Sequence, residues 1–229
     1  PSDTQFTVVA SPHGSGTEAD PYLISNLDEL EWITRDSDRW IVHYEQTADI
    51  DASATSTWNS GFGFLPIGDS GTNKFTGTYD GNGYEISNLF IDRSDTDDVG
   101  LFGYYVGLFG YTGSIAEIKN VGLVDATVIG DVYVGGIVGW NYGIVKNSYA
   151  TGSASGYSDV GGLVGGNGGT VENSYATGSA SGSYAYIGGL VGGNYGTGTV
   201  SNSYATGSAS GSVEVGSLVG GLVGGNDGT

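Results

Sequence analysis

The chain has 229 residues, 44 of them Gly, and its 6 Lys and Arg residues stand against 25 Asp and Glu residues, a formal net charge of −19. The absence of Cys excludes disulfide-stapled domains and thiolate metal sites, and so few cations cannot neutralise a nucleic-acid backbone, so no nucleic-acid partner is expected. No apolar run reaches the roughly 18 residues that a membrane-spanning segment needs, and the Gly content disfavours a mostly helical fold because Gly costs about 1 kcal/mol per helical position relative to Ala.

The acidic residues are concentrated in the first half of the chain, because only six of the 25 follow residue 119. Carboxylates in excess of cations keep a protein surface hydrated under strong salt screening. The balance therefore indicates an extracellular protein of a salt-adapted microbe, and an ordinary acidic secreted protein is the alternative.

The first predicted element is a short amphipathic helix over 27–34, with apolar residues at 27, 30 and 33. Asn26 is a suitable N-cap residue, and Asp28 and Glu29 are favourably placed in the first helical turn. Such a helix can cover the end of a solenoid, which would otherwise expose unpaired strands. We expect residues 1–45 to form an N-terminal cap and residues 46–134 to form irregular early coils.

The later chain contains internal repeats. Asn-Ser-Tyr-Ala-Thr-Gly begins at Asn147, Asn173 and Asn202, and Gly-Gly-Leu-Val-Gly-Gly-Asn lies between the copies. Each repeat offers three short strand-like pieces, of which 186–191 is one, separated by Gly or Asn. The pattern predicts an all-β fold, a parallel β-helix with three short strands per coil, and regular coils over 135–229 that break off at the carboxy-terminal end.

Alternation within each repeat separates an inner from an outer face. In 148–155 the small residues Ala150 and Ala154 fall on one face, and Tyr149 and Thr151 fall on the other. Val145, Val171 and Val200 are further predicted core residues. Stacked coils place equivalent outward residues in columns. The candidate binding strip, called the ladder strip below, is Tyr149, Thr151, Tyr175, Thr177, Tyr204 and Thr206.

Asn residues also recur in register, and we interpret them as structural. Asn tolerates the left-handed backbone of a corner, and stacked amides can hydrogen-bond from coil to coil. The predicted corner ladders are Asn147, Asn173 and Asn202 in one column, and Asn141, Asn167, Asn194 and Asn226 in another.

At the level of motifs, Gly-Gly-Leu-Val-Gly followed by Asn-x-Gly and Asn-Ser-Tyr-Ala-Thr-Gly resembles the GLUG motif of large bacterial and archaeal surface proteins. Upstream stretches over 22–30, 48–53 and 75–88 are similar to the same proteins, so the resemblance covers roughly residues 20–229. It implies a right-handed parallel β-helix on an exported surface protein, often an adhesin. Related repeats are attached to immunoglobulin-cleaving metallopeptidases, but this chain has no His-Glu-x-x-His, and His13 and His43 stand alone.

Two segments depart from the motif spacing. Gly-Leu-Phe-Gly-Tyr occurs twice, at 100–104 and 107–111, and the sequence stutters over 218–224. The chain also stops at Thr229, where another coil would begin. Either it is a fragment of a longer protein, or the open end pairs with a neighbouring copy of the chain.

Acidic turns are candidates for calcium, which prefers hard oxygen ligands. The candidate ligands are Asp80 and Asn82 in one tight turn, and Asp92, Asp95, Asp97 and Asp98 in a second loop. Neither turn follows the EF-hand spacing, and a solvated acidic loop is the simpler explanation. No other cofactor is expected.

A catalytic role has weaker support. Asp49 and Asp51 share one strand face, and Asp80 could approach them from a neighbouring coil as the carboxylates of a glycosidase or lyase. No Lys or Arg accompanies them in sequence, so we do not predict an enzyme.

The sequence therefore favours an extracellular structural and adhesive module that presents the ladder strip to a cell-surface or carbohydrate ligand, or to neighbouring copies end to end. An ice-binding protein that uses the Thr and Ser face is the first alternative, and a carbohydrate-active β-helix enzyme is the second.

Overall fold

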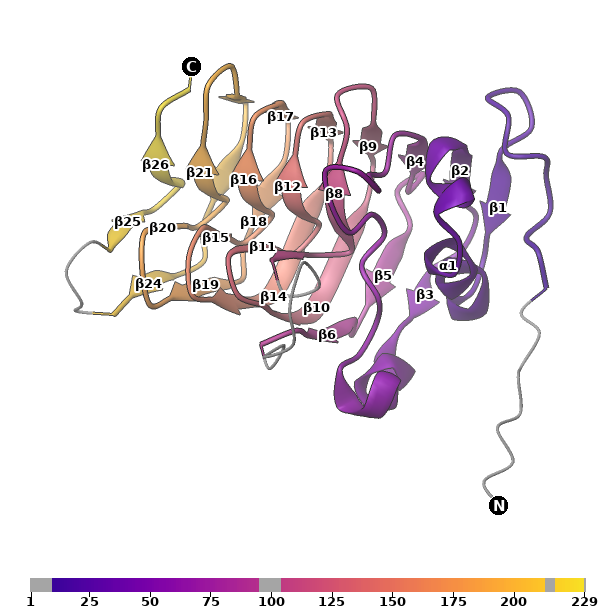
Figure 1. The fold of residues 1–229 in the computed structure, drawn as a ribbon, viewed down its shortest axis with the longest axis horizontal. Helices are drawn as coiled ribbons and strands as arrows, with labels where there is room; N and C mark the ends of the chain where they lie inside the picture. Colours follow the sequence, from indigo (N-terminus) through magenta and orange to yellow (C-terminus); the bar gives the residue numbers. More distant parts are fainter. Residues whose placement is uncertain (1–9, 95–103, 213–216, 229) are drawn as a thin grey trace.

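The computed structural model describes residues 10–94, 104–212 and 217–228, and these residues form a solenoid of parallel coils (Figure 1). Successive coils stack along one axis, with the N-terminal segment at one end and β26 at the other. Strands from neighbouring coils pair in parallel throughout the four sheets. The predicted all-β solenoid with a short N-terminal helix is confirmed.

The strands of the described residues form four sheets, numbered here in the order in which a coil visits them. Sheet 1 contains β1 (Tyr22–Ile24), β2 (His43–Gln46), β4 (Thr78–Asp80), β9 (Glu117–Lys119), β13 (Ile144–Lys146), β17 (Thr170–Glu172) and β22 (Thr199–Ser201). Sheet 2 contains β3 (Ile50–Asp51), β5 (Glu85–Ser87), β6 (Phe90–Asp92), β10 (Gly122–Ile129), β14 (Tyr149–Gly156), β18 (Tyr175–Ala176), β19 (Ser179–Gly182), β23 (Tyr204–Ala205) and β24 (Ala209–Gly211).

The other two sheets are shorter. Sheet 3 contains β7 (Tyr105–Val106), β11 (Tyr133–Gly135), β15 (Val160–Gly161), β20 (Tyr186–Gly188) and β25 (Leu218–Gly220). Sheet 4 contains β8 (Phe109–Thr112), β12 (Val138–Asn141), β16 (Val164–Asn167), β21 (Val191–Asn194) and β26 (Val223–Asn226). The helical segments are α1 (Leu27–Thr34) and the 3₁₀ turns Ser37–Ile41, Ser53–Thr57 and Asn59–Gly61.

The expectation of three strands per coil is wrong, because each regular coil contributes to four sheets. The segment 186–191, expected as one piece, divides into β20 and β21. The chain turns so tightly between them that a Cβ on Gly188 would lie 1.9 Å from the carbonyl oxygen of Val191. In the preceding coil, a Cβ on Gly161 would lie 2.0 Å from the carbonyl oxygen of Val164. Only Gly fits such a turn, so the recurring glycine creates a fourth corner.

Helix α1 spans the residues that the sequence predicts, and it begins directly after the predicted N-cap residue Asn26. The Asn26 side chain accepts a hydrogen bond from Glu29 N at 3.0 Å, and the Glu29 carboxylate accepts one from Ser25 N at 2.7 Å. These two bonds satisfy backbone donors at the helix N-terminus. Leu30 and Ile33 are fully buried, so α1 packs its apolar side onto the N-terminal end of the solenoid (Figure 1).

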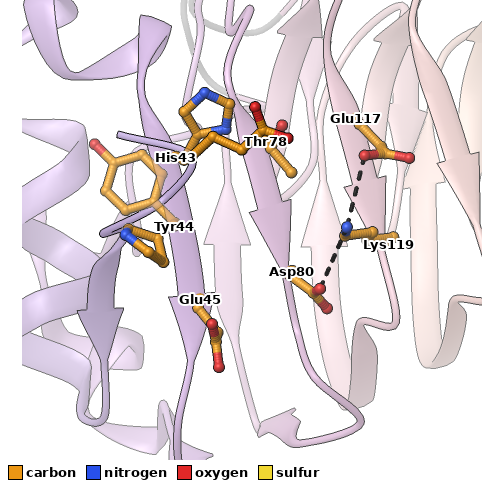
Figure 2. Close-up of a pocket in the computed structure, with 9 residues that line it drawn as sticks. His43, Tyr44, Glu45, Thr78, Asp80, Glu117 and Lys119 are labelled. Carbon is orange, nitrogen blue, oxygen red and sulfur yellow. Dashed lines mark ion pairs between the residues drawn. The ribbon is translucent and has the colours of Figure 1, made fainter. Parts of the chain in front are cut away.

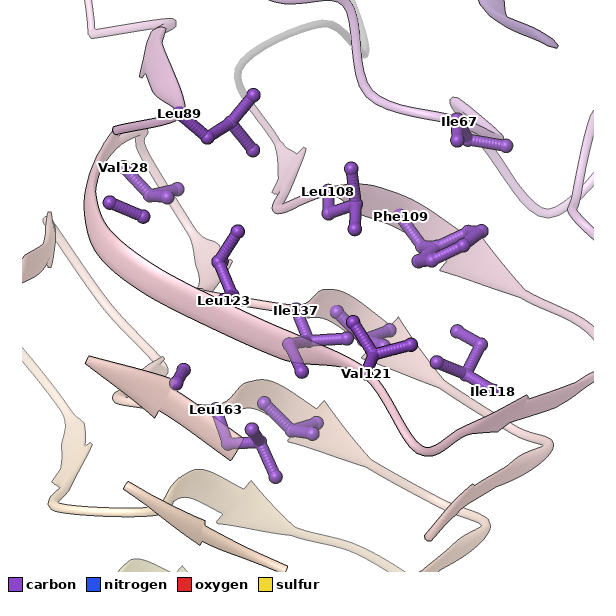
Figure 3. Packing of buried hydrophobic residues seen from close by; sticks show 14 of the residues in the cluster. Ile67, Leu89, Leu108, Phe109, Ile118, Val121, Leu123, Val128, Ile137 and Leu163 are labelled. Atoms are coloured by element: carbon purple, nitrogen blue, oxygen red, sulfur yellow. The ribbon is translucent and has the colours of Figure 1, made fainter. Parts of the chain in front are cut away.

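The inward side chains of sheet 1 become smaller from the N-terminal end of the solenoid onward. One inward column of sheet 1 reads Tyr44, Tyr79, Ile118, Val145 and Val171, each paired in register with the next. All five side chains are buried. Figure 3 shows the same interior nearer its centre, where buried side chains from successive coils lie against one another. Each fully buried aliphatic side chain contributes about 1.5–3 kcal/mol, so stability accumulates coil by coil.

The apparent irregularity over 218–224 is a regular coil. Leu218 and Val219 pair with Tyr186 and Ile187 in sheet 3, and Val223 pairs with Val191 in sheet 4. The first Leu-Val is therefore the sheet 3 strand, and the second belongs to the repeated motif. The earlier Gly-Leu-Phe-Gly of 100–103 lies outside the described residues.

Candidate functional sites on the outer faces

The ladder strip contains a stack of tyrosine rings. Tyr149, Tyr175 and Tyr204 occupy equivalent positions in sheet 2. Their ring centroids are 4.9 and 5.0 Å apart, and the ring planes differ by 2° and 3°. The Tyr149 ring leans over the preceding coil, because a Cβ on Gly122 would lie 2.6 Å from its hydroxyl oxygen. Neighbouring rings therefore cover each other's faces, and the strip presents ring edges; the Tyr149 hydroxyl donates a hydrogen bond to the Glu85 carboxylate at 2.5 Å.

The threonines of the strip are less uniform. Backbone hydrogen bonds from Thr177 N to Ala150 O and from Thr206 N to Ala176 O keep the column in register. Thr177 and Thr206 are exposed and lie between strands, whereas Thr151 lies in β14. The Thr151 hydroxyl accepts a hydrogen bond from Asp125 N at 2.7 Å. One of the three hydroxyls is therefore already engaged by the protein.

The Asn column of sheet 4 is a continuous chain of side-chain amides. Asn141 Nδ2 donates to Asn167 Oδ1 at 2.9 Å, and Asn167 donates to Asn194, and Asn194 to Asn226, at 2.8 Å each. Asn141, Asn167 and Asn194 are buried. Buried amides of this kind must be paired, because an unsatisfied polar group costs about 1–3 kcal/mol.

The other Asn column lies at the corner between sheets 1 and 2. Asn147, Asn173 and Asn202 all adopt a left-handed backbone, with φ of 51°, 49° and 49°. Upstream, Asn120 has the same conformation and accepts a hydrogen bond from Asn147 Nδ2 at 3.2 Å. The sequence motif did not reveal Asn120 as part of this column, because Val-Gly follows it in place of Ser-Tyr.

Sheet 1 carries a polar groove of about 150 Å³ on its outer face (Figure 2). The Glu117 carboxylate forms ion pairs with two lysines in this region. Lys146 Nζ lies 2.5 Å from its Oε1, and Lys119 Nζ lies 3.7 Å from its Oε2. Lys119 also lies 3.4 Å from Asp80 Oδ2, as the dashed lines in Figure 2 show. His43, Tyr44, Glu45 and Thr78 lie beside these groups.

The electrostatics of this groove do not suit acid catalysis by Glu117. The hydrogen bond from Lys146 holds the pKa of the Glu117 carboxyl below its usual range, and the same bond raises the pKa of Lys146. Glu117 is therefore ionised at neutral pH, whereas a glycosidase needs one carboxyl group that keeps its proton.

The three carboxylates considered for catalysis each bind a different partner within the protein. Asp49 accepts a hydrogen bond from Glu85 N at 2.9 Å. Asp51 accepts one from Ser53 N at 2.9 Å, and this bond, with help from Asn88, lowers its pKa. Asp80 instead pairs with Lys119 on sheet 1.

The candidate calcium ligands fall in two places. Asp80 Oδ1 accepts hydrogen bonds from Asn82 N and from Asn120 Nδ2, each at 2.9 Å. Asp92 ends β6 on sheet 2 and accepts hydrogen bonds from Ser94. Asp95, Asp97 and Asp98 lie outside the described residues. Within residues 10–94, 104–212 and 217–228, no group of three or more His, Asp or Glu side chains is arranged to hold a metal ion.

Sequence reasoning missed a second aromatic surface, which we call the aromatic platform. It lies over sheets 3 and 4, and its members are Tyr105, Tyr133, Trp140, Tyr142 and Tyr195. The residues come from three different positions in the repeat, so the motif pattern does not group them: Tyr105 and Tyr133 share a column of sheet 3, Trp140 lies in sheet 4, and Tyr142 and Tyr195 directly follow the Asn column. The only signal was the unusually high Tyr content, 16 residues.

Known proteins resemble this chain in motif and sequence. The profile of the GLUG motif matches residues 130–155, 156–181 and 183–210, so the chain carries three GLUG motifs. Halomucin from Haloquadratum walsbyi is 44% identical over 144 residues, which are 62% of this chain and 2% of that protein. A protein named as a Gly-rich membrane protein, from Evansella cellulosilytica, is 36% identical over 137 residues, 58% of this chain and 15% of its own length. This chain thus spans a small part of both relatives.

A solved structure has a similar fold. It is the crystal structure of a candidate immunoglobulin A1 protease from Bacteroides ovatus, with a TM-score of 0.74 and 25% sequence identity. The superposition covers 93% of this chain and 64% of that chain. Among the described residues of our chain, no helix is long and apolar enough to cross a membrane.

Proposed function

We propose that this chain, with its three GLUG motifs, is a rigid β-solenoid module of a cell-surface protein from a salt-adapted microbe. The name of one relative as a membrane protein supports this location. The similarity to halomucin from Haloquadratum walsbyi and the net charge of −19 support the salt adaptation. Antibody labelling of intact and lysed cells of the source organism tests the location. Labelling of lysed cells alone would contradict it.

The module's role is repeated contact with another surface through the ladder strip. The observation that carries this proposal is the in-register stack of Tyr149, Tyr175 and Tyr204, with centroid spacings of 4.9 and 5.0 Å. Ring edges that recur at coil spacing offer the same weak contact several times. Several weak contacts on one rigid body add up to strong attachment through high effective concentration.

A bead assay tests the strip. Beads coated with the chain are applied to cells of the source organism and to films of cellulose, chitin and dextran, and retained beads are counted under flow. The test variant combines Tyr149→Ser, Tyr175→Ser and Tyr204→Ser. The matched control combines Ile144→Ser, Thr170→Ser and Thr199→Ser, which also form an in-register outward column, in sheet 1.

Retention that is lost in the test variant and kept in the control would support the role of the strip. Equal retention of both variants, or no retention of the unaltered chain on any surface, would overturn it. Circular dichroism and urea unfolding of each variant show whether the solenoid remains folded.

A further inference from the structure

The aromatic platform is continuous across several coils. Tyr105 and Tyr133 begin neighbouring strands of sheet 3, and their ring centroids are 5.4 Å apart with planes 6° apart. Tyr133 meets the indole of Trp140 edge to face at 4.4 Å. The ring centroid of Trp140 in turn lies 5.4 Å from that of Tyr195 and 5.6 Å from that of Tyr142. Side chains from sheet 3, from β12 and from the residues directly after β12 and β21 therefore form one aromatic surface.

Glycine residues form the floor beneath these rings. A Cβ on Gly166 would lie 2.4 Å from the Trp140 ring, and a Cβ on Gly193 would lie 2.5 Å from the Tyr195 ring. Gly166 and Gly193 occupy the same register position as Trp140 in successive coils. The two rings thus lie against bare backbone on one side, with planes only 21° apart. A side chain at either glycine would lift the ring off the sheet.

This arrangement differs from the ladder strip in which part of the ring is available. In the strip, parallel rings cover one another's faces. In the platform, Trp140 and Tyr195 each have a glycine beneath one ring face and are half-buried, and Tyr142 beside them is 45% exposed. Outward ring faces are electron-rich and attract the C–H groups of a ligand laid flat upon them.

A buried carboxylate holds one ring in place. Asp159 is 5% exposed and has a left-handed backbone, with φ of 52°. It accepts hydrogen bonds from the Tyr195 hydroxyl and from Ser158 Oγ, the latter at 2.5 Å. Tyr195 is therefore fixed before any ligand arrives, and a rigid surface loses less entropy on binding.

We propose that the aromatic platform binds an uncharged polysaccharide, with sugar rings stacked on Trp140 and Tyr195 and sugar hydroxyls hydrogen-bonded to the neighbouring Tyr hydroxyls. Sugar rings offer flat C–H faces between polar edges, which match outward aromatic faces with hydroxyl rims. The net charge of −19 disfavours acidic polysaccharides. The inference shares the exterior location of the proposed function but uses a different face of the solenoid.

Affinity electrophoresis tests the proposal with the folded chain. Native gels contain a neutral β-glucan, a neutral α-glucan, a mannan, soluble chitin oligosaccharides or, as the acidic comparison, alginate. We expect at least one neutral polysaccharide to retard the chain and alginate not to retard it. Trp140→Ala and Tyr195→Ala should each weaken the binding about tenfold, because each removes a stacking face.

Conservative variants keep the test independent of folding. Trp140→Phe retains a smaller ring and should give intermediate retardation. Tyr195→Phe keeps the ring but loses the hydroxyl that binds Asp159, so it should bind more weakly than the unaltered chain and more strongly than Tyr195→Ala. Tyr175→Ala in the ladder strip should not change retardation, which separates the platform from the strip. No retardation by any neutral polysaccharide, stronger retardation by alginate, or unchanged binding of both alanine variants would overturn the proposal.

Discussion

The side-chain amide of Asn141 donates a hydrogen bond to Asn167 Oδ1 at 2.9 Å, and both residues are fully buried although they belong to different coils. The same nitrogen is 3.2 Å from Gly143 O. One side chain thus satisfies the backbone at its own corner and also binds the next coil. Because neighbouring amides repeat this arrangement, the column ties the coils together along the axis.

Replacing Asn167 should therefore destabilise the chain. Asn167→Ala removes the acceptor that Asn141 Nδ2 finds in the next coil and the donor to Asn194 Oδ1, and we expect a loss of about 1–3 kcal/mol in the free energy of unfolding. Urea unfolding followed by circular dichroism measures the loss. Asn173→Gly is the control, because Asn173 is exposed at φ 49° and Gly adopts that conformation freely. Equal losses in the two variants would contradict a special role for the buried column.

The tyrosine stack should contribute to stability through its rings. Tyr175 lies between two parallel rings, so Tyr175→Ala removes two aromatic contacts, each about 0.5–1.5 kcal/mol beyond the buried area. Tyr175→Phe keeps both contacts and should unfold at nearly the same urea concentration as the unaltered chain. If the Phe variant is as unstable as the Ala variant, the hydroxyl rather than the stack is responsible.

Asp159 should make stability depend on pH. Burial raises the pKa of this carboxyl above its ordinary value of 3.8, so the folded chain binds the proton more tightly than the unfolded chain. Its stabilising contribution is fully present below 3.8 and is lost as the pH rises through the folded-state pKa. The melting temperature of the unaltered chain, relative to Asp159→Asn, should fall between about pH 3.8 and neutrality. A constant difference across that range would show that Asp159 has an ordinary pKa in the folded state.

Salt should stabilise the folded chain. With a net charge of −19, self-repulsion opposes the compact state, and raising NaCl from about 0.1 M to about 1 M shortens the Debye length from about 10 Å to about 3 Å. The urea midpoint should rise over this range, although screening weakens the Glu117–Lys146 pair. At about pH 4, where many carboxyl groups are protonated, the rise should be smaller. A midpoint that falls with salt at neutral pH would contradict this expectation.

Interior packing offers a further test of the coil arrangement. Leu163 is fully buried, so Leu163→Ala should cost about 2–5 kcal/mol. Ile144 lies on the outer face of sheet 1 and is 39% exposed, so Ile144→Ala should change stability by no more than about 0.5 kcal/mol. Urea unfolding of the two variants compares them directly. Similar losses would mean that the two residues are not on opposite faces of the wall.

The local pattern of the sequence was sufficient to predict the solenoid and its cap. Alternation places Ala150 and Ala154 inside and Tyr149 outside, because side chains of a strand point alternately to its two faces. The caps around Asn26 and Glu29 likewise predict α1, since both act within one helical turn. Repetition then places like residues in register, because each coil pairs with an almost identical neighbour.

Contacts between different positions of neighbouring coils were decided only by the tertiary structure. The fourth corner depends on how closely Gly188 approaches Val191, which a three-strand interpretation of the repeat does not reveal. Trp140, Asp159 and Tyr195 occupy unrelated places in the repeat, and they meet because the chain turns between sheets 3 and 4. Periodicity records which residues share a column, whereas the geometry of the turns determines which columns become neighbours.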